Sequence, residues 1–152
     1  MPRTAAPTAV DEELVGRLRI SVARLARLLR QQDQSGLTPT TTATLITIAR
    51  DGPITLGELA TVEQVAPPTI TKSVSRLEEA GFVERIPDPA DKRVCRVVLT
   101  AAGQRQLDEN RLRRTVWLTE RLDQLPADEQ RRLEDVVELL EHLTTAPEGD
   151  AR

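Results

Sequence analysis

Residues 81–100, GFVERIPDPADKRVCRVVLT, contain two apolar runs on either side of a loop with two prolines, two aspartates, a lysine and an arginine. In the second run Cys95, Val97 and Leu99 alternate with residues of the opposite face, which is the period-two pattern of a half-buried strand. Asp and Pro are common turn formers, so the stretch predicts a β-hairpin with a charged tip. We expect Cys95, Val97 and Leu99 to face the core together.

The remainder of the chain is predicted to be helical, because its core must be built almost without aromatic side chains. The 152 residues include one Trp, one Phe and no Tyr, and a core of Leu, Val, Ile and Ala suits packed helices better than a β-sandwich. The length predicts one domain with a real core rather than two. Apolar spacing and breaker residues predict helices at about 11–33, 39–50, 56–62, 68–80, 101–124 and 127–144. The expected fold class is mainly α with a small β-hairpin.

Several of these helices carry an N-terminal capping signal. Thr38 precedes Pro39, Thr55 stands three residues before Glu58 as in a capping box, and Thr100 precedes the fifth helix. The helix at 68–80 has no such residue, because Ala66 precedes the Pro67–Pro68 pair.

The short helix at 56–62, a tight turn and the helix at 68–80 predict a helix-turn-helix, and the hairpin that follows predicts a wing. Ile70, Val74 and Leu77 fall on one face of the second helix and should meet the core. The opposite face, with Ser73 at its border, is short-chained and polar: Pro68, Thr69, Lys72 and Arg76. Such a face fits a DNA major groove, and the wing-tip cations Lys92 and Arg93 suit the adjacent minor groove. We therefore predict these seven residues as the DNA-binding set.

The charge balance permits this interpretation, although the chain has a net charge of −3. Residues 67–105 carry seven basic and five acidic side chains, and the rest carries 14 basic against 19 acidic. A locally basic middle allows an anion site inside an acidic protein.

Other functional classes find little support in the sequence. A single Cys and a single His exclude a disulfide framework and make a zinc site implausible, so we expect no metal and no cofactor. Glycines are scattered rather than gathered in a phosphate loop, and nothing around His142 suggests a catalytic triad, so we predict no enzyme. No apolar stretch of about 18 residues would span a bilayer, and acidic residues at 11–13 stand where a signal peptide would be apolar. We expect a cytoplasmic protein without a membrane partner.

Residues 56–103 closely resemble the winged helix-turn-helix core of the MarR family of bacterial transcriptional regulators. The family's wing pattern of an Asp, a basic residue and an Arg, then Leu-Thr and Gly, is matched by Asp91, Lys92, Arg93, Leu99, Thr100 and Gly103. The resemblance implies that Arg93 enters the minor groove, that Asp91 holds the wing through an ion pair, and that the helix at 68–80 reads bases. Family members often have Ser before the Pro-Pro pair, where this chain has Ala66.

The resemblance extends over residues 11–144 and implies a homodimer. It predicts dimerisation helices at 11–36 and 101–144 around a DNA-binding core at 38–100, with tails at 1–10 and 145–152. Two leucine faces at the chain ends agree with this, and the residues assigned to the dimer are Leu14, Leu18, Leu133, Val137 and Leu140. A dimer should bind a palindromic operator with half-sites about one helical turn, roughly 34 Å, apart. The family also implies release from DNA by a small phenolic or aromatic acid, for which Arg24, Arg27, Arg30, Arg111, Arg113 and Arg114 are candidates.

Three alternatives stay open. The leucine faces could serve a helical protein-interaction module without specific DNA binding. Cys95 could be a redox sensor beside Arg93 and Arg96, although the strand pattern turns it inward. Glu138 and His142 lie one helical turn apart and could share a metal, but they lack a third ligand.

Overall fold

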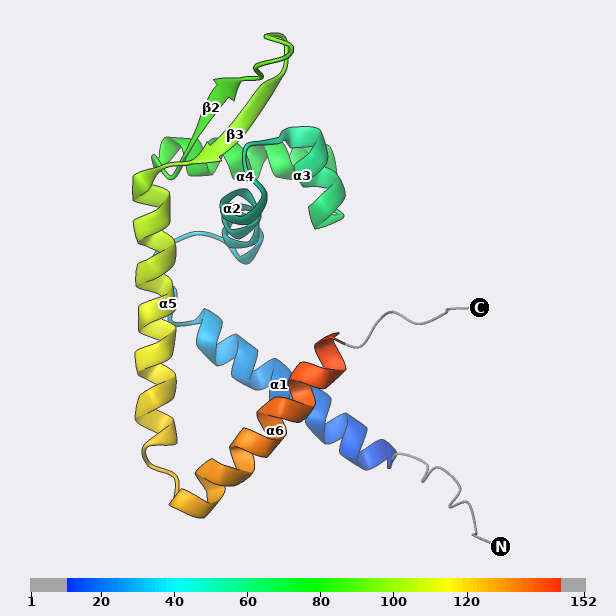
Figure 1. The fold of residues 1–152 in the computed structure, drawn as a ribbon, viewed down its shortest axis with the longest axis vertical. Helices are drawn as coiled ribbons and strands as arrows, with labels where there is room; N and C mark the ends of the chain where they lie inside the picture. The colour runs from blue at the N-terminus through cyan, green and yellow to red at the C-terminus, as the bar shows by residue number, and fades with distance from the viewer. Residues whose placement is uncertain (1–10, 146–152) are drawn as a thin grey trace, which may run out of the picture. The chain divides into compact units, whose positions relative to one another are not determined.

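The computed structural model describes residues 11–145, which form six helices and three short strands (Figure 1). The predicted tails, Thr145 apart, lie outside these residues. The elements are α1 (Glu12–Arg30), α2 (Pro39–Asp51), β1 (Ile54–Thr55), α3 (Leu56–Glu63), α4 (Pro67–Glu79), β2 (Val83–Pro87), β3 (Cys95–Leu99), α5 (Ala101–Leu122) and α6 (Ala127–Thr145). They belong to two compact units, the first ending at Arg114 and the second beginning at Thr115, and α5 runs across the boundary. The predicted fold class is confirmed.

The first unit contains the hydrophobic core. Side chains from α2, α3 and α4 pack on one another and against the sheet. The buried apolar members are Leu45, Ile48, Ile54, Leu59, Ala60, Ile70, Val74, Leu77, Val83 and Val97. All of them are aliphatic, as the scarcity of aromatic residues predicts, and Phe82 only borders the cluster.

The sheet is antiparallel with the strand order β1–β3–β2. The predicted hairpin forms it together with a strand that the sequence did not reveal. Val83 pairs with Leu99 at the base of the hairpin, Pro87 pairs with Cys95 near its tip, and Ile54 pairs with Val97 on the other side. β1 has only two residues, too few for any alternation to show in the sequence.

The predicted caps are present. Thr38 Oγ1 accepts from the Thr41 amide, and Thr100 Oγ1 accepts from the Gly103 amide at 3.1 Å. The first helix begins after Asp11, whose carboxylate accepts from the Glu13 amide, and it ends at Arg30, earlier than predicted. These caps set where each helix begins and therefore which residues face outward.

The helices at the two chain ends keep their apolar side chains uncovered in the single chain. α1 and α6 contain no buried residue. Leu14, Leu18 and Val137 are 57%, 39% and 45% exposed, while Leu133 and Leu140 are half-buried. In the single chain the last helix therefore leaves most of its apolar face exposed. Among the helices of residues 11–145, none combines the length and the apolar character needed to span a membrane.

Candidate nucleic-acid interface

The helix pair at the centre of the first unit begins with the capping box predicted for α3. The Thr55 hydroxyl accepts from the Glu58 amide at 3.2 Å, and the Glu58 carboxylate accepts from the Thr55 amide at 2.8 Å. This reciprocal bonding gives α3 a defined first turn. At its other end Gln64 adopts a left-handed conformation (φ 52°), and the Val65 amide donates to the Ala60 carbonyl. The chain thus reverses within a few residues and enters α4.

The outward face of α4 is the one predicted from sequence. Ile70, Val74 and Leu77 are completely buried beneath the helix. Pro68, Thr69, Lys72 and Arg76 are all exposed on its other side. The Ala66 position has no side-chain cap, in agreement with the missing hydroxyl.

Ser73 is the one member of the predicted DNA-binding set that the fold turns away from solvent. Only 4% of its surface is exposed, because at about 100° per residue Ser73 lies about 40° from the buried Leu77 and therefore on the inner side of the helix. Thr71 is exposed instead, and sequence reasoning missed it. Its hydroxyl donates to the Pro67 carbonyl at 3.0 Å. A hydroxyl side chain within the first two turns of α4 is a sequence signal from which Thr71 could have been predicted.

The loop between β2 and β3 is organised by Asp88, which the sequence did not single out. Its carboxylate accepts from the amides of Ala90 (2.7 Å) and Asp91 (3.1 Å), and it forms an ion pair with Arg96. Only 9% of the Asp88 side chain is exposed. The Arg96 guanidinium, followed by those two amides, lowers the pKa of Asp88 below its usual range.

The ion pair implied for Asp91 is absent from the described residues, so that expectation is wrong. The Asp91 carboxylate accepts from the Arg93 amide at 3.0 Å, and its carbonyl accepts from the Val94 amide at 2.9 Å. Asp91 therefore shapes the tip through backbone hydrogen bonds, because the Arg96 guanidinium is already bound to Asp88. In the wing loop, residues 88–94, the ion pair belongs to Asp88.

Cys95 is exposed, contrary to the inward orientation predicted for it. Val97 on the same strand is buried and Leu99 is half-buried. Cys95 pairs with Pro87 in the last rung before the loop, where the hairpin projects past the helices (Figure 1). Cys95 lies on the same face of β3 as Val97, but at the end of the strand this face no longer covers the hydrophobic core.

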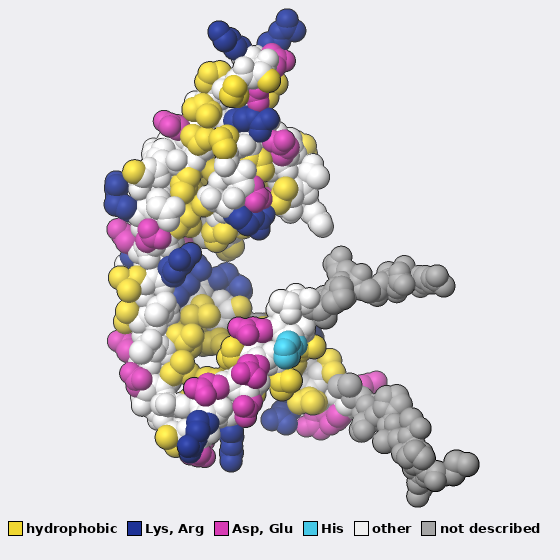
Figure 2. Space-filling model, viewed as in Figure 1, with side chains coloured by type: hydrophobic (Ala, Val, Ile, Leu, Met, Phe, Trp, Pro, Cys, Tyr) yellow, Lys and Arg dark blue, Asp and Glu magenta, His cyan; other side chains and the backbone are white. Residues whose placement is uncertain are grey.

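The cations of the predicted interface are free of carboxylate partners. Within residues 11–145 no ion pair involves Lys72, Arg76, Lys92 or Arg93, and all four side chains are exposed. Figure 2 shows Lys and Arg side chains standing at the tip of the β2–β3 hairpin. An unpaired guanidinium or ammonium group retains its full capacity to meet a phosphate or a base edge.

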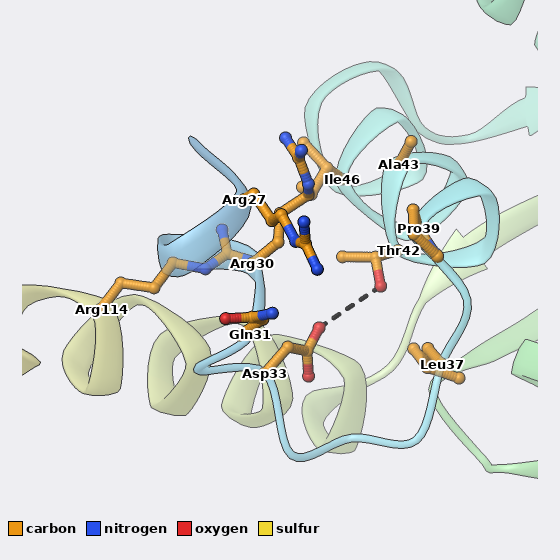
Figure 3. A pocket seen from close by; sticks show the side chains of 10 residues that line it. All are labelled: Arg27, Arg30, Gln31, Asp33, Leu37, Pro39, Thr42, Ala43, Ile46 and Arg114. Atoms are coloured by element: carbon orange, nitrogen blue, oxygen red, sulfur yellow. Dashed lines mark hydrogen bonds between the residues drawn. The ribbon is translucent and has the colours of Figure 1, made fainter. Parts of the chain in front are cut away.

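A second feature of the first unit is a cavity of about 510 Å³ beside α2. Its polar lining comes from Arg27, Arg30, Gln31, Asp33, Thr42 and Arg114, and its apolar lining from Leu37, Pro39, Ala43 and Ile46. In Figure 3 the arginines of α1 and Arg114 of α5 extend toward the same region, and Thr42 faces Asp33. Of the six arginines named as effector candidates, three line this cavity.

Asp33 is the carboxylate of this cavity and is already engaged within the protein. It accepts hydrogen bonds from the Ser35 amide at 2.8 Å and the Thr42 hydroxyl at 3.4 Å. Partial burial by itself would raise the pKa of Asp33, but hydrogen bonds from Ser35 and Asn110 and the charge of Arg114 lower it overall. The cavity thus combines cationic groups with an apolar wall and an ionised carboxylate.

Comparison with known proteins identifies the chain. The model of the MarR family matches residues 37–95, which run from the start of α2 to the beginning of β3. The HTH-type transcriptional regulator ML2140 of Mycobacterium leprae is 36% identical over 131 residues, covering 86% of this chain and 92% of that protein. The chain belongs to the MarR family. It is thus a transcriptional regulator of a DNA-binding family.

Solved structures of regulators share the fold of this MarR-family chain. A transcriptional regulator of Thermotoga maritima superposes with a TM-score of 0.74 at 28% identity, covering 88% of this chain and 94% of that one. A variant of MepR from S. aureus, bound to an oligodeoxyribonucleotide, has a TM-score of 0.70 at 19% identity, covering 86% and 97%. At that identity the second comparison concerns the fold alone.

Proposed function

We propose that this protein is a ligand-responsive repressor that binds an inverted repeat as a homodimer. The observation that carries the DNA-binding part is the outer face of α4 together with the wing tip. Exposed hydroxyls and unpaired cations lie on these two adjacent elements, while the acidic side chain at the start of the wing loop, Asp88, is paired with Arg96. Short side chains near the start of α4 allow close approach to base edges, and cations beyond them reach guanine edges or phosphates.

In this proposal α4 lies in the major groove, with Pro68, Thr69, Lys72 and Arg76 toward the DNA. The wing presents Lys92 and Arg93 to the neighbouring minor groove, where the negative potential is strongest when the groove is narrow. Asp91 keeps the tip in shape through its bond to the Arg93 amide. The MepR variant shares the fold and is bound to an oligodeoxyribonucleotide, which supports DNA binding by a protein of this fold.

The homodimer part rests on α1 and α6, which would form the dimerisation module with the rest of residues 101–144. Both helices carry large apolar side chains that stay exposed in the single chain. Their charges are also complementary: α1 has five arginines and two glutamates, whereas α6 has six acidic residues and two arginines. Leucine contacts flanked by such charges suit a second copy of the chain, and two-fold symmetry then calls for an operator with inverted half-sites about one helical turn apart.

The ligand-responsive part rests on the cavity beside α2. Arg27, Arg30 and Arg114 suit a carboxylate, and the wall of Leu37 and Ile46 suits an aromatic ring. A phenolic or aromatic acid fits this combination. Such a ligand releases DNA only by binding the DNA-free arrangement more tightly, and a differential of about 1–3 kcal/mol would lower operator affinity by roughly 5- to 150-fold.

The experiment is a selection of bound duplexes from a random pool, followed by a salt titration on the recovered sequence. A two-fold-symmetric sequence is expected, with affinity that falls steeply as salt rises. Arg93→Ala should weaken binding by about tenfold or more and reduce the salt slope by about two, because a dimer loses two cations. Arg50→Ala is the matched control, since Arg50 already pairs with Asp51 at 2.6 Å, and it should leave affinity nearly unchanged. Recovery of no preferred sequence, or equal effects of the two variants, would contradict the proposal.

A further inference from the structure

One side chain of the wing connects it to the helix-turn-helix. Arg96 lies on β3, and its Nε donates to the Asp88 carboxylate, the side chain that organises the wing loop. Its Nη1 donates to the Pro53 carbonyl at 3.1 Å, just before β1, and lies 3.5 Å from the Glu58 carboxylate on α3. A single guanidinium therefore meets three segments: the wing loop, the residue before β1 and the first turn of α3.

The partners of Arg96 are themselves fixed by other hydrogen bonds. Asp88 binds the amides of Ala90 and Asp91, so its carboxylate holds the start of the wing loop. Glu58 binds both the amide and the hydroxyl of Thr55 in the capping box. The guanidinium thus joins two carboxylates whose positions are set independently, one in the wing and one in α3. Only an arginine offers a planar fork that can reach several acceptors from one position.

The direction of Arg96 separates it from the cations assigned to DNA. Its side chain is 30% exposed and its donors point at acceptors of the protein, whereas Lys92 and Arg93 have no carboxylate partner among residues 11–145. A second link, between Arg85 on β2 and Glu78 on α4 at 3.1 Å, lies nearer the base of the hairpin and does not touch the wing loop. Of these two links, the one made by Arg96 is therefore the one that holds the wing loop.

We propose that Arg96 is a positioning residue for DNA binding. It holds the wing loop at a fixed angle to α3, so that Arg93 reaches the minor groove while α4 occupies the major groove. The inference rests on the proposed role of the wing. It assigns to Arg96 no contact with DNA, and it predicts that removing Arg96 removes most of what Arg93 contributes.

The first test uses the free protein and does not depend on DNA. In Arg96→Gln, amide hydrogen exchange should accelerate at Ala90, Asp91 and Val94, the amides bonded within the wing loop, and should stay unchanged at Leu59 and Val74 in the core. Asp88→Asn, which removes the other half of the ion pair, should give the same pattern. Unchanged exchange in the loop of both variants would overturn the proposal.

The second test is a double-mutant cycle on the duplex that the wild-type protein selects from a random pool. Arg93→Ala and Arg96→Gln should each weaken binding by about tenfold, and the double variant should bind only slightly more weakly than either. Hydroxyl-radical protection of the minor groove next to each half-site should disappear in Arg96→Gln, while the major-groove contacts of α4 remain. Fold losses that multiply in the double variant, or an intact minor-groove footprint, would overturn the inference.

Two further variants separate positioning from charge. Arg96→Lys keeps the positive charge but cannot reach all three acceptors, so affinity should stay reduced; full recovery would mean that Arg96 acts by charge alone and would overturn the inference. Arg85→Gln removes the same charge from the other strand of the hairpin, and the loss caused by Arg93→Ala should persist undiminished in that background. If Arg93→Ala no longer weakens binding in the Arg85→Gln background, the positioning role is not specific to Arg96 and the inference is overturned. If the wild-type protein selects no duplex, the proposed function fails, and the exchange experiment alone decides on Arg96.

Discussion

Replacing Gly103 by alanine tests how closely α5 approaches the hairpin. Gly103 is buried in the first turn of α5, and a Cβ built there would collide with the Phe82 carbonyl oxygen and lie 2.7 Å from Leu99 Cδ1 and 3.0 Å from the Phe82 carbonyl carbon. Two of these three atoms belong to the backbone, so a change of rotamer cannot relieve the clash. The same carbonyl oxygen accepts from the Thr100 amide at 3.0 Å. The substitution must therefore shift the start of α5 away from β2 and β3.

The magnitude follows from opposing contributions. Overpacking of a well-packed site typically costs about 1–3 kcal/mol, and disturbing the bond to the Phe82 carbonyl adds up to about 1 kcal/mol. The higher helix propensity of alanine offsets at most about 1 kcal/mol, and less in a first turn. We expect Gly103→Ala to lower the free energy of unfolding by about 2 kcal/mol, which for a chain of this size lowers Tm by roughly 4–8 °C.

The assay is thermal unfolding followed by circular dichroism at a fixed protomer concentration, because a dimer's Tm depends on concentration. Gly16→Ala is the matched control: Gly16 lies within α1, and a Cβ there would meet nothing within 4 Å. This variant should gain up to about 1 kcal/mol from helix propensity alone. The two substitutions should change Tm in opposite directions, and this contrast is the essential result. A Gly103→Ala protein that melts at or above the wild-type temperature would refute the close approach.

Three further outcomes are expected. Thr100→Ala removes the acceptor for the Gly103 amide and the donor to the Gly81 carbonyl (2.6 Å), so it should cost about 1–2 kcal/mol of unfolding free energy in urea titrations; a cost near zero would contradict the cap. The lowered pKa of Asp88 means that its stabilising effect is complete above about pH 5 and is lost as pH falls through the folded-state pKa. The Tm difference between wild type and Asp88→Asn should therefore shrink below about pH 4, and a difference that grows on acidification would have the wrong sign. Val137→Glu puts a charge on the exposed apolar face of α6 and should convert dimer to monomer in sedimentation velocity, whereas an unchanged sedimentation coefficient would remove α6 from the interface.

Local signals in the sequence were enough to predict the helices and the outer face of α4. Thr38, Thr55 and Thr100 mark helix starts because a capping hydroxyl acts within three residues of its own position. The buried stripe of Ile70, Val74 and Leu77 follows from helix geometry alone. The predicted caps and the buried stripe therefore agree with the structure, whereas Ser73, assigned to the border of the outer face, is buried.

Predictions that depend on contacts between distant parts of the chain were missed or wrong. The pairing of Ile54 with Val97 joins residues far apart in sequence, and two residues carry no periodic signal. The Cys95 prediction used alternation correctly but could not tell where the helices beneath the hairpin end. The ion pair assigned to Asp91 belongs to Asp88 because Arg96 is oriented by Pro53 and Glu58, which no local pattern relates to the wing.

The ion pairs leave the net charge of +2 in residues 67–105 unchanged, but they determine which of its cations remain available. Between residues 67 and 105 the acidic side chains Glu78 and Asp88 are bound to Arg85 and Arg96, and those same contacts fix the hairpin to its surroundings. The two paired cations, Arg85 and Arg96, lie on the strands of the hairpin, whereas the cations at its tip and on α4 have no carboxylate partner among the described residues. A chain with a net charge of −3 can therefore present a local cationic surface to a polyanion, because the unpaired cations of α4 and of the wing tip remain exposed. For the same reason, charge reversal within the Arg96 network should weaken DNA binding more than an equal change of net charge on α6.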